Sequence, residues 1–132
     1  MLDVRLDKYI HEMRTQDFEW GKLDCVLFAC NWAEEHVGVN PAEGSQYAYN
    51  DEKSAYEHLK ERYGGIEDGL DKHFKQIAPT FRQKGDIALC RVQEQEILGI
   101  CGGRGFVFFK AKPKGIFCKR EPDVLNVWRV SP

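Results

Sequence analysis

The sequence predicts an α+β fold in which helices come first and an antiparallel sheet follows. Up to about residue 65, apolar residues recur three or four positions apart, which is the spacing of a helix face. After Pro79 the pattern changes to short apolar runs separated by polar or glycine-rich turns. A chain of 132 residues, 42% of them hydrophobic, has the size and composition of one folded domain, which we place at residues 1–132.

The first helix is predicted over residues 2–14, and a loop that carries Phe18 and Trp20 toward the body of the fold follows it. Five apolar side chains form the stripe of this helix: Leu2, Leu6, Tyr9, Ile10 and Met13. The second helix is predicted to start at the cap residue Asp24 and to end at Gly38. Because it is apolar almost from its first residue, we expect it to lie centrally, packed between other elements.

A third helix is predicted to begin after Asn50 or Asp51 and to stop at the glycine pair 64–65, and residues 66–79 support only one or two helical turns. The sheet is predicted as an antiparallel meander of five strands, at residues 86–92, 96–101, 106–110, 116–119 and 124–130. In the strand 106–110 both faces are apolar, which suggests that a partner covers one of them.

Charge and hydropathy exclude several classes of protein. The 19 basic and 21 acidic residues are interspersed and give a net charge of −2, which argues against a nucleic-acid partner. The one basic cluster, residues 110–114, is interpreted as a solvated turn. No apolar run approaches the ~20 residues that span a bilayer. The N-terminal residues have no signal-peptide pattern, so we expect synthesis in a cytoplasm.

The Asp24–Cys25 pair is the most suggestive feature for chemistry. As the helix cap, Asp24 places Cys25 at the first helical position, where the helix dipole favours thiolate over thiol. The pair therefore suggests a cysteine nucleophile, although a free cysteine at a helix start can equally be a small buried hydrophobe.

The five cysteines, at positions 25, 30, 90, 101 and 118, contain no Cys-x-x-Cys pair and leave one unpaired. This pattern favours reduced thiols over a disulfide framework, and we predict neither a metal nor a cofactor. Cys90, Cys101 and Cys118 are expected to pack as small hydrophobes in strands, with Cys101 an alternative second thiol near the site.

Several short motifs resemble those of the NlpC/P60 cysteine peptidases. Trp20-Gly21, Asp24-Cys25 and Phe28 are similar to the aromatic-Gly-Gly…Asp-Cys-Ser-Gly-Phe signature of that family. Gly85-Asp86-Ile87 resembles the motif that opens the family's sheet, and residues 97–100 with the glycines that follow resemble its His-Val-Gly-Ile strand. The whole pattern, down to the terminal residues 128–130, looks most like small proteins encoded in phage and prophage tail regions.

The resemblance implies a papain-like fold whose central, cysteine-bearing helix packs on a C-terminal antiparallel sheet. It also implies that Cys25 attacks an amide in the peptide stem of peptidoglycan, with a histidine of the sheet as base. Here the position matching that histidine is Ile97, and bulky Val26 and Leu27 stand where the family has Ser and Gly.

No residue is a convincing substitute for the missing base. Glu96 is next to Ile97, but strand alternation directs it to the opposite face unless the alignment shifts by one residue. His36 lies three helical turns from Cys25, roughly 16 Å away. The remaining histidines, His11, His58 and His73, are expected at exposed positions.

Two hypotheses follow. In the first, the chain is a structural or assembly component of a phage tail, on an NlpC/P60-like fold that has lost its catalytic histidine. In the second, it is an active peptidase or amidase that cleaves peptidoglycan stems during phage entry, with Cys25 as nucleophile and an unidentified base. Under either, we expect a virion location in the tail, and as partners other tail proteins and, where it acts on the wall, peptidoglycan.

Overall fold

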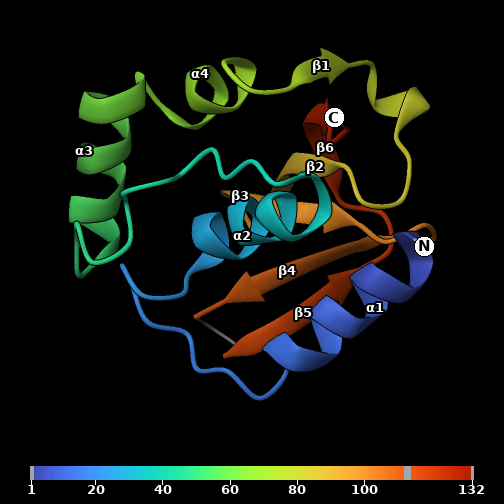
Figure 1. Ribbon diagram of the computed structural model, residues 1–132, viewed down its shortest axis with the longest axis horizontal. Coiled ribbons are helices and arrows are strands. Elements are labelled where there is room, and N and C mark those ends of the chain that lie inside the picture. The colour runs from blue at the N-terminus through green and yellow to red at the C-terminus, as the bar shows by residue number, and fades with distance from the viewer. Residues whose placement is uncertain (1, 112–113, 132) are drawn as a thin grey trace.

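The computed structural model describes residues 2–111 and 114–131. Lys112 and Pro113, within the predicted basic turn, and the side chain of Leu2 lie outside the described residues. The fold is α+β, with four helices and a six-stranded antiparallel sheet (Figure 1). None of the described helices is long and apolar enough to cross a membrane.

The helices lie close to where the sequence predicts them. They are α1 (Leu2–Met13), α2 (Cys25–Val37), α3 (Glu52–Tyr63) and the short α4 (Ile66–Asp71). Asp24 caps α2, and Asp51 rather than Asn50 caps α3 through a capping box with Ser54. Gly38 and Gly64 end these two helices in the left-handed conformation, with φ of 78° and 87°.

The sheet has the strand order β1-β6-β2-β3-β4-β5, and each pair of neighbouring strands is antiparallel. The strands are β1 (Lys75–Ile77), β2 (Ile87–Val92), β3 (Gln95–Cys101), β4 (Phe106–Lys110), β5 (Gly115–Lys119) and β6 (Asp123–Arg129), and a 3₁₀ turn, η1 (Pro79–Phe81), follows β1. The sequence pattern did not indicate the three-residue β1 or η1.

The predicted meander is correct for β2 to β5 and wrong for the last strand. Instead of pairing with β5, β6 returns across the sheet to lie between β1 and β2. The buried carboxylate of Asp86 holds it there, because it accepts hydrogen bonds from Arg129 Nε, from the Val130 N–H and from the Gln83 N–H. The Gly85-Asp86-Ile87 motif and the terminal residues 128–130, which are far apart in the sequence, therefore meet at the end of the sheet.

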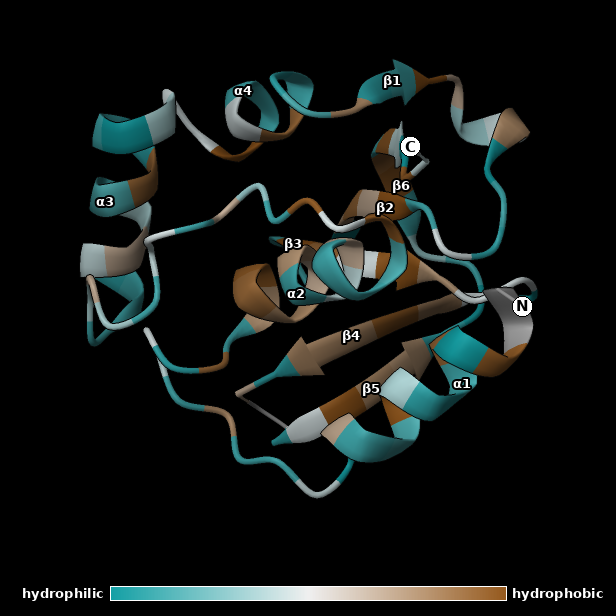
Figure 2. Ribbon diagram, in the orientation of Figure 1, coloured by the Kyte–Doolittle hydropathy of each residue, from teal (hydrophilic) through white to brown (hydrophobic). Residues whose placement is uncertain are grey.

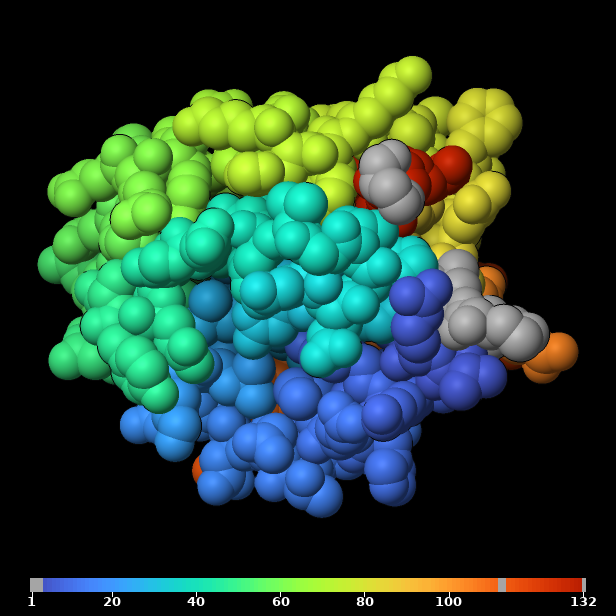
Figure 3. Space-filling view, in the orientation of Figure 1, coloured from blue at the N-terminus to red at the C-terminus, as the bar shows by residue number. Residues whose placement is uncertain are grey.

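Helix α2 lies across one face of the sheet, and α1 lies beside it over β5, whereas α3 and α4 stand at the rim (Figure 1). Hydrophobic residues are concentrated on α2 and on the strands beneath it (Figure 2). The helices and the loop of residues 38–51 cover most of this face (Figure 3). The glutamates of α2, Glu34 and Glu35, are exposed as expected.

The prediction that a partner covers one face of β4 is wrong, because every side chain of this strand is buried within the chain. On one face Phe109 stacks on Phe28 of α2, with ring centroids 5.5 Å apart. On the other face Phe108 packs against Phe117 and fills the space above Gly99.

Candidate functional site

The carboxylate of Asp24 organises the start of α2. It is fully buried, and its Oδ1 accepts hydrogen bonds from the N–H groups of Val26 and Leu27, both at 3.0 Å. Its Oδ2 accepts from the Gly21 N–H at 3.1 Å and from the Tyr49 hydroxyl at 2.7 Å. Asp24 therefore joins the aromatic corner, the helix and the loop that leads to α3.

Gly21 fits this corner because it has no side chain. Its φ is +85°, a conformation that glycine adopts without strain, and a Cβ there would lie 1.8 Å from the carbonyl oxygen of Tyr49. The aromatic-Gly motif is thus the part of the chain that lets the loop of residues 38–51 close over Asp24.

Cys25 occupies the first position of α2, as predicted, but its thiol is held protonated. Only 6% of the residue is exposed, and burial raises the pKa of the thiol to about 12. The negative charge of Asp24 contributes to this rise, whereas the N–H groups of Val26 and Cys25 act in the opposite direction. The N–H groups of the helix start therefore do not decide the state of the thiol, because burial is the largest cause of its raised pKa and the anionic cap residue Asp24 is the second.

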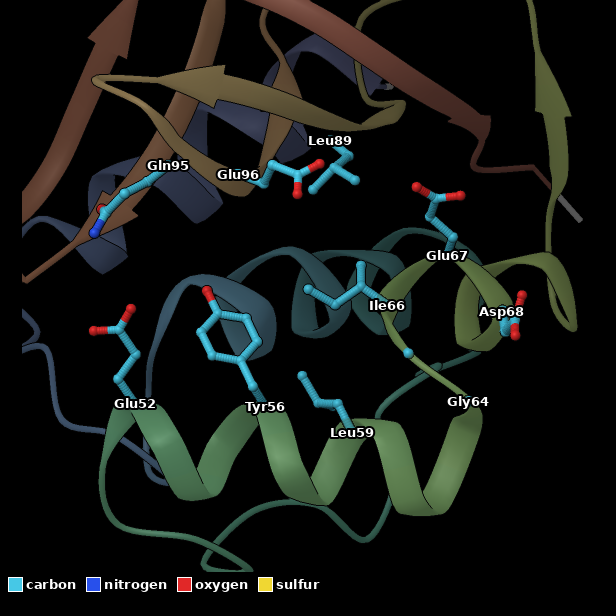
Figure 4. A pocket seen from close by; sticks show the side chains of 11 residues that line it. Glu52, Tyr56, Leu59, Gly64, Ile66, Glu67, Asp68, Leu89, Gln95 and Glu96 are labelled. Atoms are coloured by element: carbon cyan, nitrogen blue, oxygen red, sulfur yellow. The ribbon is translucent and has the colours of Figure 1, made fainter.

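Cys25 borders a cavity of about 350 Å³ that opens between α3 and the ends of β3 and β4. A second cavity of about 570 Å³ adjoins it and extends to α4 (Figure 4). The two cavities share the lining residues Glu52, Tyr56, Gln95 and Glu96, so we treat them as one groove and call it the α3 groove. Trp20 and Phe18 line its Cys25 end.

No histidine of the described residues lines the α3 groove. His11 and His73 are exposed as predicted. His36 stacks on Trp32 with ring centroids 5.0 Å apart, and desolvation lowers its pKa.

His58 is half-buried, so its predicted exposed position is wrong. Its Nε2 lies 3.0 Å from the hydroxyl of Ser45, and its ring packs on Tyr49. The loop before α3 folds back onto the helix and covers this histidine, which the helical spacing alone could not indicate.

The strand register places Glu96, not Ile97, on the side of α2. Glu96 and Leu98 share one face of β3, and Leu98 borders the same small space as Val26 and Cys30 of α2. The side chain of Glu96 accordingly points into the α3 groove (Figure 4). Ile97 has Cys90 as its cross-strand partner on the other face, and it borders the groove only where β3 and β4 separate.

The other cysteines do not join the site. Cys30, Cys90 and Cys101 are buried, and burial raises the pKa of each thiol to about 12. Cys118 is exposed, which differs from its predicted packing in a strand, because β5 is an edge strand of the sheet. Among the described residues, no group of three histidine, cysteine or acidic side chains is placed to hold a metal ion.

Tyr56 stands where the two cavities join. Its ring is partly exposed, and its hydroxyl is directed across the groove toward β3 (Figure 4). Burial is the largest cause that raises the pKa of the phenol to about 12, and the carboxylates of Glu52, Asp24 and Glu96 contribute to the rise. The groove thus holds a neutral thiol and a neutral phenol between carboxylates. The sequence did not identify Tyr56 and Glu52 as site residues, because α3 has the usual mixture of polar and apolar residues and nothing in it marks a functional site.

The chain belongs to the family described as a domain of unknown function (DUF6950), whose match covers residues 2–130. No curated protein matches the chain.

Replacing Gly21 by alanine should lower the free energy of unfolding by about 3 kcal/mol or more, because a backbone oxygen occupies the space of the new Cβ. Gly38 is the matched control, since its φ is +78° and nothing lies within 4 Å of its Cβ position. Gly38→Ala should cost only about 1 kcal/mol. Urea unfolding followed by tryptophan fluorescence measures both, and equal losses would contradict the close approach to Tyr49.

His36 should make stability depend on pH. Its pKa in the folded protein is lowered by desolvation and by Arg5, while Asp86 opposes the shift. As pH falls below about 6.5, the unfolded chain takes up this proton first, so the free energy of unfolding should decrease. Between pH 7.5 and pH 5.5 the free energy of unfolding should decrease less in His36→Gln than in the parent protein. The control His11→Gln, at an exposed position, should show the same decrease as the parent protein. Identical profiles for all three proteins would rule out a contribution from His36.

Proposed function

We propose that this member of the DUF6950 family is a structural or assembly component of a phage or prophage tail, built on a papain-like NlpC/P60-type fold without cysteine–histidine chemistry. The observation that carries the proposal concerns Cys25, which stands at the position of the nucleophile. Its thiol has a raised pKa, and no histidine among the described residues lines its cavity.

The chemistry of amide cleavage explains the weight of this observation. The attacking species is a thiolate, and a thiol with a pKa of about 12 is ionised in only about one molecule in 100,000 at pH 7. A cysteine peptidase overcomes this with an adjacent imidazole that holds the thiolate and then protonates the leaving amine. After burial and the charge of Asp24, the charge of Glu52 in the groove also raises the pKa of the thiol and so opposes its ionisation.

The tail assignment is supported by the order of the motifs along the chain and by their meeting in space. Trp20-Gly21 and Asp24-Cys25 form the corner and helix start, and Gly85-Asp86 contacts the terminal Arg129 and Val130. In this proposal the protein is made in the host cytoplasm, is carried in the virion tail and has other tail proteins as partners.

The second candidate is an active peptidase or amidase acting on peptidoglycan stems. One observation favours it: Cys25 borders a cavity large enough for part of a peptide. Such an enzyme would require a group that lowers the thiol pKa by several units in the complex with its substrate.

The pH dependence of alkylation tests the state of the thiol. Cys25 should react slowly with iodoacetamide at pH 7, with a rate that keeps rising to the highest pH at which the protein stays folded, because its pKa is about 12. Mass spectrometry of the labelled peptides follows each cysteine, and the exposed Cys118 is the internal reference. Reaction of Cys25 that persists well below pH 7 would instead indicate a stabilised thiolate and favour the peptidase.

Purified muropeptides test the activity directly. The protein should release no new amines from them, and phage carrying Cys25→Ser should assemble and infect normally, as should phage carrying Cys118→Ser. If amines appear with the parent protein and not with Cys25→Ser, or if Cys25→Ser virions lose only wall degradation, the structural proposal is wrong.

A further inference from the structure

The sheet is split at the α3 groove. β3 pairs with β2 from Gln95 to Ile100, but it pairs with β4 only at Ile100–Val107 and Cys101–Phe106. Continuing that register would bring residues 95–98 opposite residues 109–112, and these pairs do not form between the described residues. The two strands therefore separate toward the end of the sheet that lies near Cys25.

The Cys25 end of the groove occupies this split. Its lining includes residues 95–97 from β3 and residues 109–111 from the end of β4 and beyond. In an antiparallel strand, alternate residues direct their N–H and C=O groups away from the neighbour with which they pair. The outer edge of β3 at residues 95–97 thus presents main-chain groups that a further extended segment can pair with.

The groove is also negatively charged. Its side chains include Glu52 and Glu67 from the first turns of α3 and α4, Asp68 beside Glu67, and Glu96 from β3. None of these four carboxylates forms a salt bridge within the described part of the chain. The helix dipole favours acidic residues in the first turns of α3 and α4. It does not account for the carboxylate of Glu96, which lies on the opposite, sheet side of the groove.

No basic side chain of the described lining is available to balance this charge. Lys110 lines the Cys25 end, but its Nζ donates a hydrogen bond to Gln93 and lies 4.6 Å from the ring centroid of Phe117. Arg91 is the cross-strand partner of Glu96, yet the two form no ion pair and Arg91 does not line either cavity.

We propose that the α3 groove binds an extended segment of a partner protein that carries lysine or arginine, with its main chain pairing along the open edge of β3 at residues 95–97 and its basic side chains placed beside Glu52 and Glu96. The occupant is extended because an open strand edge recognises a strand, and it is basic because carboxylates line both walls of the groove, Glu52 on α3 and Glu96 on β3. Trp20 and Tyr56 supply apolar walls for its other side chains.

This inference rests on the proposed function, since it gives the tail component a groove that holds a partner segment without cutting it. The thiol of Cys25 then serves as a marker of occupancy, because it borders the cavity that the segment enters.

The test uses three fluorescein-labelled nonapeptides of alternating threonine and valine. The first has two lysines near its centre, the second has glutamates at the same places, and the third keeps the lysines but has methyl groups on alternate backbone nitrogens. Fluorescence anisotropy at low salt measures the affinity of each peptide for three proteins: the full chain, the groove variant Glu52→Gln/Glu96→Gln and the control variant Glu61→Gln/Glu121→Gln. The control is matched because its two glutamates are exposed and lie outside the groove lining. Thermal unfolding verifies that both double variants are folded.

The lysine peptide should bind about fivefold or more tightly than the glutamate and methylated peptides, and only the groove variant should lose this preference. Binding should slow hydrogen exchange of the amides at residues 95–97. Equal affinity for the three peptides, or slowed exchange elsewhere on the chain, would overturn the inference and leave the proposed function standing. Cleavage of the bound lysine peptide, detected by mass spectrometry in the same samples, would overturn the proposed function while the groove assignment survives.

Discussion

The rest of the structure depends on one buried carboxylate, that of Asp24. Removing an anion from water costs several kcal/mol, and here four hydrogen bonds from Gly21, Val26, Leu27 and Tyr49 offset that cost. Because the four donors come from the aromatic corner, the start of α2 and the loop before α3, they fix where α3 stands. That position sets one wall of the groove beside Cys25. The same charge opposes ionisation of the neighbouring thiol, so the interaction that builds the site also restricts its chemistry.

Local elements of the fold could be predicted because their signals are local. Asp24 and Gly38 mark the ends of α2 by their preferences for cap positions, and both predictions are confirmed. The sheet order could not be predicted in the same way, because the return of β6 depends on Asp86, whose hydrogen bonds reach residues more than 40 positions away. The periodicity of apolar residues indicates local helices and strands, but it does not indicate a contact between residues so far apart in the sequence.

The candidate site was predicted in part for a similar reason. Asp24 and Cys25 are adjacent and were found together, whereas Tyr56 and Glu52 reach the groove only through the tertiary placement of α3. The face of Glu96 depends on a one-residue register, since a shift of one position exchanges the two sides of a strand. Sequence alignment by resemblance placed Ile97 at the base position, and the register of β3 instead directs Glu96 to the groove.

Binding and cleavage are separable functions of this groove. A basic side chain beside Glu52 would offset part of the negative charge near Cys25 and so lower the pKa of the thiol. Burial, however, is the largest cause of the raised pKa, and a bound segment that covers the cavity would add to burial. The two effects act in opposite directions, and none of the described histidines lines the cavity of Cys25 to take the proton. A ligand can therefore occupy the α3 groove without converting Cys25 into a nucleophile, which is the property that the proposed structural role requires.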